Sequence, residues 1–284
     1  MADNRFNIRR LFHLYALYAK MDAAWLLRDT KYCLIGILAD FIANASVLSG
    51  VFFIAERFGG VGGMTNDEVL FMLGYSTITT GLFLVFFNGN NVGHISRIIG
   101  RGQLDHKLIQ PIPIRIQLMT EGFMPVSGSG QLWAGLAACT IAIWRLNLPI
   151  TVGWVVLFIM FHLITQVIFL SMMYIPSVLA FYFPVAAEET ASAVADLQWQ
   201  LSSYPLGQMP TLIKITLNTV LPIGLTVWFP SLVLLGKERL DFGLIVLITA
   251  TVLFATLATM LFKKGLKHYE KIGSQRYTDF GHRR

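Results

Sequence analysis

The sequence predicts an all-α, polytopic membrane protein with six transmembrane helices and an N-terminal amphipathic helix at the membrane surface. Of its 284 residues, 55% are apolar and only 13% are charged, about half the charge of an ordinary soluble domain. The charged residues also gather in short clusters between long uncharged runs, which is the pattern of membrane proteins. A soluble domain of this length could not cover its surface with so few charges.

Residues 1–31 are predicted to form a cytoplasmic segment that contains the amphipathic helix. Within residues 6–25, apolar and aromatic side chains share one helical face, whereas Arg9, His13 and Lys20 lie on another. A signal peptide is not expected, because no small-residue cleavage site follows the short apolar run at 11–19. We therefore expect a helix that lies in the membrane interface.

The transmembrane domain is predicted to cover residues 32–262. Its six apolar runs, each about 20 residues or longer and therefore able to cross a bilayer, are 32–54, 69–87, 123–144, one starting near 151, 212–235 and 242–262. The fourth run stays uncharged as far as residue 185, so we expect Pro176 to kink or end its helix. Thr65 and Glu68 have the spacing of a capping box, which would open the second helix.

Lysine and arginine residues predict the orientation. Six of them lie in residues 1–31, four in the loop 88–121, one (Lys214) between the fourth and fifth spans, and seven in a basic tail at 263–284. These eighteen face only four on the opposite side, namely Arg57, Arg145, Lys237 and Arg239. Because cytoplasmic loops are enriched in these residues, both termini and the 88–121 loop are predicted to be cytoplasmic.

No motif for catalysis or nucleotide binding appears in the sequence. The glycines at 59–63 lack the lysine of a phosphate-binding loop, so we expect no cofactor or metal on this chain. Asp40 and His162 are the clear ionisable residues inside the spans, but no nucleophile motif accompanies them. The net charge of +6 is explained by cytoplasmic loops, and no nucleic-acid partner is expected, because no basic stripe alternates with exposed aromatics.

Asp40 and Asn44 are the candidate residues of a substrate pathway. Asp40 lies about 12 Å into the first predicted helix. An acid at such a depth costs about 2.5–3.5 kcal/mol, so we do not expect it to face lipid. Asn44 follows one turn later. Two roles stay open for Asp40: an anchor for hydrogen bonds between helices, or a group that attracts a cationic substrate.

The loop 88–121 carries the most informative motif. Its glycines bracket short helical pieces, and Pro111 prevents a helix from continuing through Gln110. The run Gly-Arg-Gly-Gln-Leu-Asp-His at 100–106, followed by Ile-Gln-Pro-Ile-Pro at 109–113, resembles the first cytoplasmic loop of type-2 ATP-binding-cassette (ABC) export permeases. The branch it resembles consists of stand-alone six-span subunits.

Weaker motifs extend the resemblance over residues 20–275. They are Lys-Met-Asp at 20–22, Tyr204-Pro205, the prolines Pro222 and Pro230, and the segment 265–270. Ser203 departs from the pattern, which has a basic residue before Tyr204-Pro205.

The resemblance implies the permease subunit of an ATP-driven exporter in a bacterial plasma (inner) membrane. Its partners would be a cytoplasmic ATPase dimer, which holds ATP and Mg, and a second six-span permease, identical or a sister chain, in the lipid bilayer. The N-terminal helix would act as an elbow. The residues expected to couple the permease to the ATPase are Gly102, Gln103, Leu104, Asp105, His106, Leu108 and Gln110.

Two alternatives stay open from the residues alone. A secondary transporter would be expected to carry several intramembrane ionisable groups or repeated halves, whereas this chain has one acid in its spans and no repeat. A membrane scaffold subunit without transport activity is the other alternative.

Overall fold

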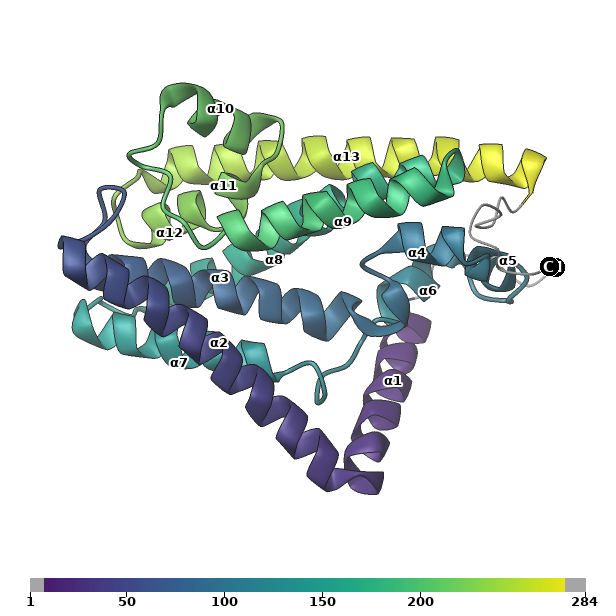
Figure 1. Cartoon of the computed structure of the whole chain (residues 1–284), viewed down its shortest axis with the longest axis horizontal. Coiled ribbons are helices and arrows are strands. Elements are labelled where there is room, and N and C mark those ends of the chain that lie inside the picture. The colour runs from purple at the N-terminus through teal and green to yellow at the C-terminus, as the bar shows by residue number, and fades with distance from the viewer. Residues whose placement is uncertain (1–7, 274–284) are drawn as a thin grey trace.

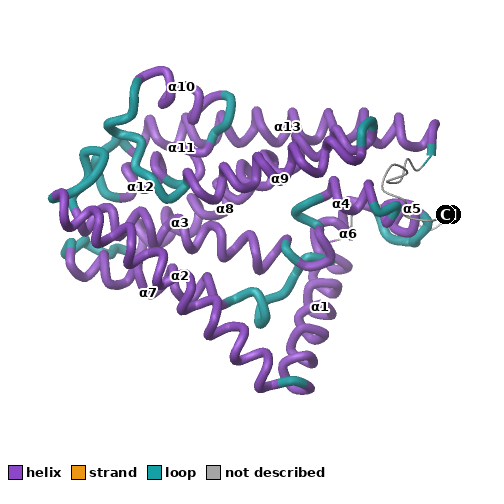
Figure 2. Tube along the Cα trace, viewed as in Figure 1, coloured by secondary structure: helices purple, strands orange, loops and turns teal. Residues whose placement is uncertain are grey.

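The computed structural model describes residues 8–273, and in this part of the chain every regular element is a helix (Figures 1 and 2). The long helices are α1 (Ile8–Arg28), α2 (Thr30–Phe58), α3 (Asn66–Phe87), α7 (Gly130–Arg145), α8 (Val152–Ser177), α9 (Pro184–Leu201) and α13 (Leu240–Ile272). The short ones are η1 (Gly89–Asn91), α4 (Ile95–Gly100), α5 (Gln103–Leu108), α6 (Ile114–Thr120), η2 (Val178–Phe181), α10 (Thr211–Thr219), α11 (Ile223–Thr226) and α12 (Trp228–Leu234).

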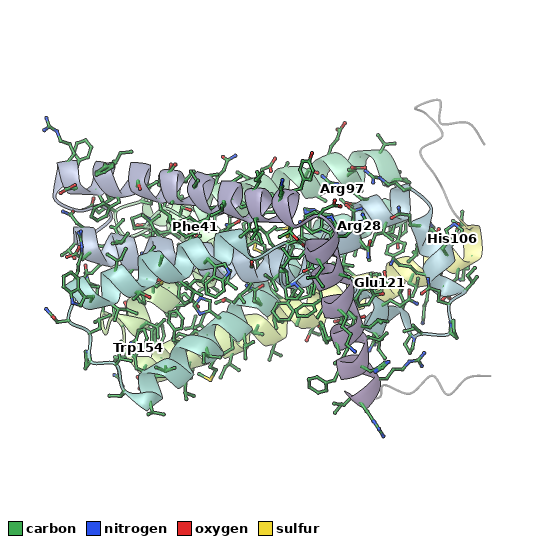
Figure 3. The ribbon with its side chains drawn as sticks, turned by 90° about the horizontal axis from the view of Figure 1, so that it is seen from below. Arg28, Phe41, Arg97, His106, Glu121 and Trp154 are labelled. Carbon is green, nitrogen blue, oxygen red and sulfur yellow. The ribbon has the colours of Figure 1, made fainter. Side chains whose placement is uncertain are left out.

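Helices α3, α9 and α13 lie along the long axis of the molecule, between its two ends, whereas α2 runs obliquely from one end to the corner that it forms with α1 (Figure 1). We call the end that carries the 88–121 segment the loop end. The other end carries the tight turns at 59–65, 146–151 and 235–239, and we call it the turn end. Figure 3 shows the two ends, with His106 at the loop end beside the last turns of α13 and Trp154 at the turn end.

Helices α3, α7 and α8 form the centre of the bundle. Phe71 and Tyr75 of α3 are fully buried and pack their rings against Trp154 and Phe158 of α8. On the other side of α3, a Cβ atom added to Gly135 of α7 would lie only 2.6 Å from a backbone nitrogen of α3. Small residues therefore let the backbones of α3 and α7 approach closely, as is common in membrane bundles.

Four helices have the length and composition to cross a membrane: α2, α3, α8 with η2, and α13. They confirm an all-α protein with several membrane-spanning helices. The capping box is also confirmed, since the Glu68 carboxylate accepts from the backbone N–H of Thr65 at 2.7 Å. Pro176 lies in the last turn of α8, and the helix ends at Ser177, as its position predicts.

The fifth predicted span is wrong as a straight helix. Residues 212–235 form α10 and the pair α11–α12, which are bent by 65° at a break that includes Pro222. Both ends of this segment lie at the turn end: Pro205 packs against Gly62, and the Lys237 ammonium donates to the Gly63 carbonyl at 3.1 Å. The segment therefore enters the bundle and returns to the end from which it came.

The helix that runs between the two ends in its place is α9. It covers 18 residues, or about 27 Å, and it packs along α8 through the buried stripe Ala187, Ala191 and Ala195. The acidic residues Glu188, Glu189 and Asp196 predict a polar helix between the fourth and fifth spans, and not a helix that runs the length of the bundle. Consequently Lys214, which donates to the Gly207 carbonyl, lies at the turn end and not with the loop-end cations.

Two further boundaries differ from the prediction. The third helix begins at Gly130 and not at residue 123, because residues 121–129 form a series of turns. The sixth helix does not end at residue 262 but continues to Ile272, so the first ten residues of the predicted tail are helical. The rest of that tail, beyond Gly273, lies outside the described residues, as do residues 1–7.

Candidate functional site: the loop end

The segment 88–121 folds into four short helices, which the sequence pattern anticipated as helical pieces between glycines. Gly102 stands immediately before α5 with φ of +68°, a left-handed conformation that glycine adopts at little cost. The chain can therefore reverse between α4 and α5 within two residues. Pro111 and Pro113 then separate α5 from α6, as the proline spacing predicts.

The loop end has a hydrophobic core of its own. Its buried members come from every element that meets there: Val92, Ile95, Ile98, Ile99, Leu104, Leu118, Val178, Ala180, Phe181, Ala187 and Tyr269. Leu104 is fully buried among them. Its side chain therefore holds α5 against the rest of the chain and is not part of the surface that a partner would meet.

Asp105 ties α5 to the last helix. The Tyr269 hydroxyl of α13 donates to its carboxylate at 2.6 Å. The C-terminal part of α13 reaches this position because Gly265 lies flat against Phe181, where an added Cβ atom would be 2.2 Å from the ring. Tyr182 and His268 also contact each other with ring centroids 4.3 Å apart. These contacts explain the segment 265–270 that the resemblance singled out.

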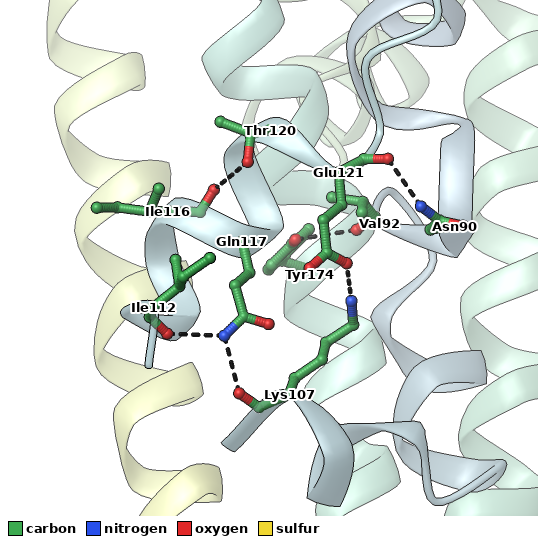
Figure 4. Close-up of polar contacts among 9 residues, drawn as sticks. All are labelled: Asn90, Val92, Lys107, Ile112, Ile116, Gln117, Thr120, Glu121 and Tyr174. Atoms are coloured by element: carbon green, nitrogen blue, oxygen red, sulfur yellow. Dashed lines mark hydrogen bonds and ion pairs between the residues drawn. The ribbon is translucent and has the colours of Figure 1, made fainter. Parts of the chain in front are cut away.

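A buried polar network closes the loop between α5 and α6 (Figure 4). Lys107 forms an ion pair with Glu121, and the two side chains are only 11% and 10% exposed. The side-chain amide of Gln117 donates to two carbonyls, those of Lys107 at 2.8 Å and Ile112 at 2.7 Å. The backbone of residues 107–121 is therefore fixed at three points, so α5 and α6 are expected to move together.

Helix α1 lies across the bundle axis and is clamped to the same segment (Figure 1). The Arg10 guanidinium donates to the Pro111 carbonyl at 2.9 Å, and the Tyr15 hydroxyl donates to the Met119 carbonyl at 2.7 Å. Near the other end of α1, the Asp22 carboxylate accepts from the backbone N–H groups of Val126 and Ser127, and from the Ser127 hydroxyl. Displacement of the loop would therefore act directly on α1 and on the start of α7.

The outward side of α5 is exposed. Leu108 and Ile109 are apolar and 37% and 81% exposed, respectively. Around them the exposed residues are Arg101, Gln103, His106, Gln110 and Pro111. Of the seven predicted coupling residues, four thus lie on this surface (Gln103, His106, Leu108 and Gln110), and three (Gly102, Leu104 and Asp105) shape α5 from within.

Asp40 and Asn44 lie far from this surface, near the middle of α2. Asn44 lines a cleft of about 300 Å³ together with Ser76, Thr77, Thr80, Gln131 and Trp199, from α3, α7 and α9. Asp40 is exposed and does not line the cleft, although its Cβ atom faces Gly130 at the start of α7. The structure thus places one of the two predicted residues in a polar cleft within the bundle.

The sequence reasoning missed the two buried groups of the loop network, Lys107 and Glu121, and the latch at Asp22. Glu121 had a signal: it is the only acidic residue between Asp105 and Glu188, in a chain where an isolated acid next to apolar runs needs a partner. Asp22 was noted only as part of a resemblance. Its three hydrogen bonds now give the physical reason for an acid there.

Comparison with known proteins agrees with this architecture. The family model described as "ABC-2 family transporter protein" matches residues 41–273, which is most of the chain. No curated protein and no solved structure matches. The chain therefore belongs to the ABC-2 family of transporter proteins, as a multi-pass membrane subunit of an ABC-type permease that associates with an ABC ATPase.

Proposed function

We propose that this chain is the permease subunit of an ATP-driven exporter, energised by a dimer of separate ABC ATPase subunits and completed by a second permease, either a copy or a sister chain. Six crossings, α2, α3, α7, α8, α9 and α13, would build its membrane domain, with 208–236 re-entering from outside. The observation that carries the proposal is the clamped loop end: an exposed apolar tip on α5 whose displacement reaches α1, α7 and α13 through hydrogen bonds.

The loop end is proposed to be cytoplasmic, in the plasma (inner) membrane of a bacterium. With Lys214 moved to the turn end, thirteen lysines and arginines among residues 8–273 belong to the loop-end segments and five to the turn end. This distribution still follows the enrichment of basic residues in cytoplasmic loops. A single cysteine placed at Asn147, which is exposed at the turn end, should react with an impermeant thiol reagent in intact cells, whereas one placed at Gly273 should not.

The α5 tip is proposed to dock into the ATPase. Apolar side chains that become buried in an interface supply much of its stability, and a charge placed there without a partner costs several kcal/mol. ATP binding and hydrolysis with Mg would take place on the partner and bias the bundle between two conformations, because each conformation holds α5 differently.

Ile109→Asp tests the docking surface, with Ile272→Asp as the matched control, since Ile272 is also an exposed isoleucine (54%) at the loop end but lies on α13. The first variant should lose co-purification with the ATPase, and the second should retain it. Leu104→Asp is unsuitable, because it would place a charge in the core. Retention of the ATPase by Ile109→Asp, and also by Leu108→Asp, would remove α5 as the docking element.

The cleft at Asn44 is proposed to belong to the transport route. Its hydroxyl and amide groups offer hydrogen bonds within the bundle, and Asp40 lies one turn away on the same helix. Asp40→Asn keeps the shape of the side chain but removes the charge. If Asp40 attracts a cationic substrate, this variant should assemble and hydrolyse ATP but lose transport of cations. Normal transport of cations by this variant would show that the charge of Asp40 is not needed for transport and that the residue serves packing.

A further inference from the structure

A second cleft shares no lining residue with the cleft at Asn44, and it has a different chemical character. It encloses about 400 Å³ between α1, α6, α8 and α13. Its lining residues are Tyr15, Phe87, Arg115, Leu118, Met119, Gln166, Val167, Leu170, Ser171, Tyr174, Ala255, Ala258, Thr259 and Phe262. Most of these are apolar, and Arg115 is the only charged one.

The cleft has the dimensions of a lipid chain and not of a protein segment. Its α8 wall extends from Gln166 to Tyr174 and its α13 wall from Ala255 to Phe262, so it is about 10–12 Å deep along the bundle axis. A helix with side chains is about 10 Å wide and would not fit in this volume. Ala255 and Ala258, which have small side chains, leave the space on the α13 side.

The basic groups of the cleft lie at its loop end. Arg115 is exposed there, and no carboxylate among residues 8–273 pairs with it. Lys263 is exposed and follows Thr259 by four residues, so it continues the same face of α13 one turn beyond the cleft. An apolar slot that ends in two cations matches a phospholipid, in which glycerol joins a fatty acyl chain to a phosphate.

We propose that this cleft binds an anionic phospholipid, with an acyl chain between α8 and α13 and its headgroup phosphate at Arg115. The bound lipid would fill the space between the clamped helix α1 and the bundle, and so stabilise α1 in its position. The cleft and its charge do not depend on the export activity. Only the leaflet depends on the proposed function: because the loop end is proposed to be cytoplasmic, the lipid would belong to the cytoplasmic leaflet.

The experiment compares lipid retention by the purified full chain after reconstitution with equal amounts of dioleoyl phosphatidylglycerol and dioleoyl phosphatidylcholine. Native mass spectrometry counts the lipids that stay bound. The wild-type chain should retain phosphatidylglycerol preferentially, and Arg115→Gln should reduce this retention about fivefold, the contribution of one basic residue near a membrane surface. Ala258→Phe fills the slot and should remove the bound lipid whatever its headgroup.

Lys271→Gln is the matched control, because it removes one exposed cation from the loop end at a distance from the cleft. It should leave retention unchanged. An equal loss in Lys271→Gln and Arg115→Gln would show general attraction to anionic lipid and would overturn the site. Full retention by Ala258→Phe would also overturn it. If Ala258→Phe fails to fold, Ala255→Leu fills the same slot with a smaller side chain and gives the same decision.

Discussion

Helices α2 and α3 are equal in mean hydropathy but opposite in surroundings. Of the 18 consecutive residues that form the apolar stretch of α2, 6% are buried within the chain, whereas in the corresponding stretch of α3 83% are buried. Apolar composition therefore identifies both as membrane helices and does not distinguish the central helix from the peripheral one. The distinction comes from what the small residues face: Gly74 and Gly81 of α3 lie against the backbone of α7, whereas an added Cβ atom at Gly36 or Gly50 of α2 would have no atom within 4 Å.

Those residues let α3 and α7 pack backbone to backbone. Gly74, Gly81 and Gly135 each lie so close to the facing helix that an added Cβ atom would meet a backbone nitrogen at 2.6–2.7 Å. The hydroxyls of Thr77, Thr79 and Thr80 donate to carbonyls of their own helix, so their burial leaves no donor unsatisfied. Between membrane helices, such close contact is the main source of stability.

The apolar face of α2 has no such partner among residues 8–273. Its exposed side chains are Tyr32, Leu34, Ile35, Leu38, Ile42, Val47, Phe53, Ile54 and Phe58. Lipid or the proposed second permease would cover this face. The other face of α2 packs against α7 and α3, where Leu48 and Ala55 are buried, and a short break after Arg28 joins α2 to α1 (Figure 3).

The largest expected effect comes from a substitution at the α3–α7 contact. Gly135→Leu should destabilise the chain by about 3 kcal/mol or more, because the new side chain meets backbone atoms that cannot move aside. Thermal unfolding in detergent measures the loss. The native thiol Cys139, buried against Gly74 in the same contact, should at the same time become reactive towards maleimide.

Gly36→Leu on α2 makes the same chemical change where no atom lies within 4 Å. It should leave the unfolding temperature of the single chain unchanged or slightly raised, since leucine favours a helix more than glycine does. If it weakens association of two permeases without unfolding the chain, α2 forms part of the interface. Equal destabilisation by both variants would refute the contrast between α2 and α3.

The sequence predicted the apolar helices well and the polar ones poorly. The spans of α2, α3, α8 and α13 begin and end within a few residues of their predicted limits, except that α13 ends ten residues later. A helix was predicted at α9, but its course between the two ends of the bundle was not, because Glu188 and Asp196 mark it as polar. In the structure Glu188 pairs with Arg97 at 3.4 Å, and a stripe of alanines is buried. Residues 212–235 were predicted to form a single span because hydropathy does not detect the break at Pro222.

In the candidate site, the motif located the loop but not the direction of its side chains. Leu104 and Leu108 are one helical turn apart, yet the first is fully buried and the second 37% exposed. The α5 helix has six residues, too few for a periodic pattern to reveal which face meets the core. The Tyr269 contact with Asp105 joins residues 164 positions apart and has no local signature.

A smaller effect is expected at the hydrogen bonds of Asp22, which hold the corner between α1 and α2. Asp22→Ala removes a charged acceptor of three hydrogen bonds and should cost about 2 kcal/mol. Because the first turn of α2 lies next to the corner that Asp22 holds, the loss should appear first at Cys33, a buried residue in that turn. In a Cys139→Ala background, Asp22→Ala should accelerate the reaction of Cys33 with maleimide.

In a Cys33→Ala background, the thiol of Cys139 should stay protected from maleimide in the Asp22→Ala variant, since the α3–α7 contact that buries it does not include Asp22. Asp22→Asn retains one acceptor oxygen and should give an intermediate rate at Cys33. An unchanged rate at Cys33, or equal acceleration at both thiols, would mean that α2 is held by contacts other than Asp22.

The smallest expected effect concerns pH. His94, at the contact between α4 and α9, is a titratable group that packs against α3 near the loop end. His94 is buried, with its ring 6.5 Å from that of Phe83 and 6.1 Å from that of Trp199. Burial, and next the Arg97 guanidinium, lower the pKa of His94 below its usual range, although Asp196 and Glu188 act in the opposite direction. The folded chain thus favours the neutral imidazole. Its stabilising effect is fully present above the unfolded pKa of about 6.5 and is lost as the pH falls below it, by at most about 1.4 kcal/mol per pH unit.

His94→Phe keeps a ring in this position but cannot take up the proton. Between pH 7.5 and pH 5.5 the unfolding temperature of this variant should fall less than that of the wild-type chain. The carboxylates, which titrate in both proteins, cancel in the comparison, so equal falls would exclude His94 as a pH-sensitive contact.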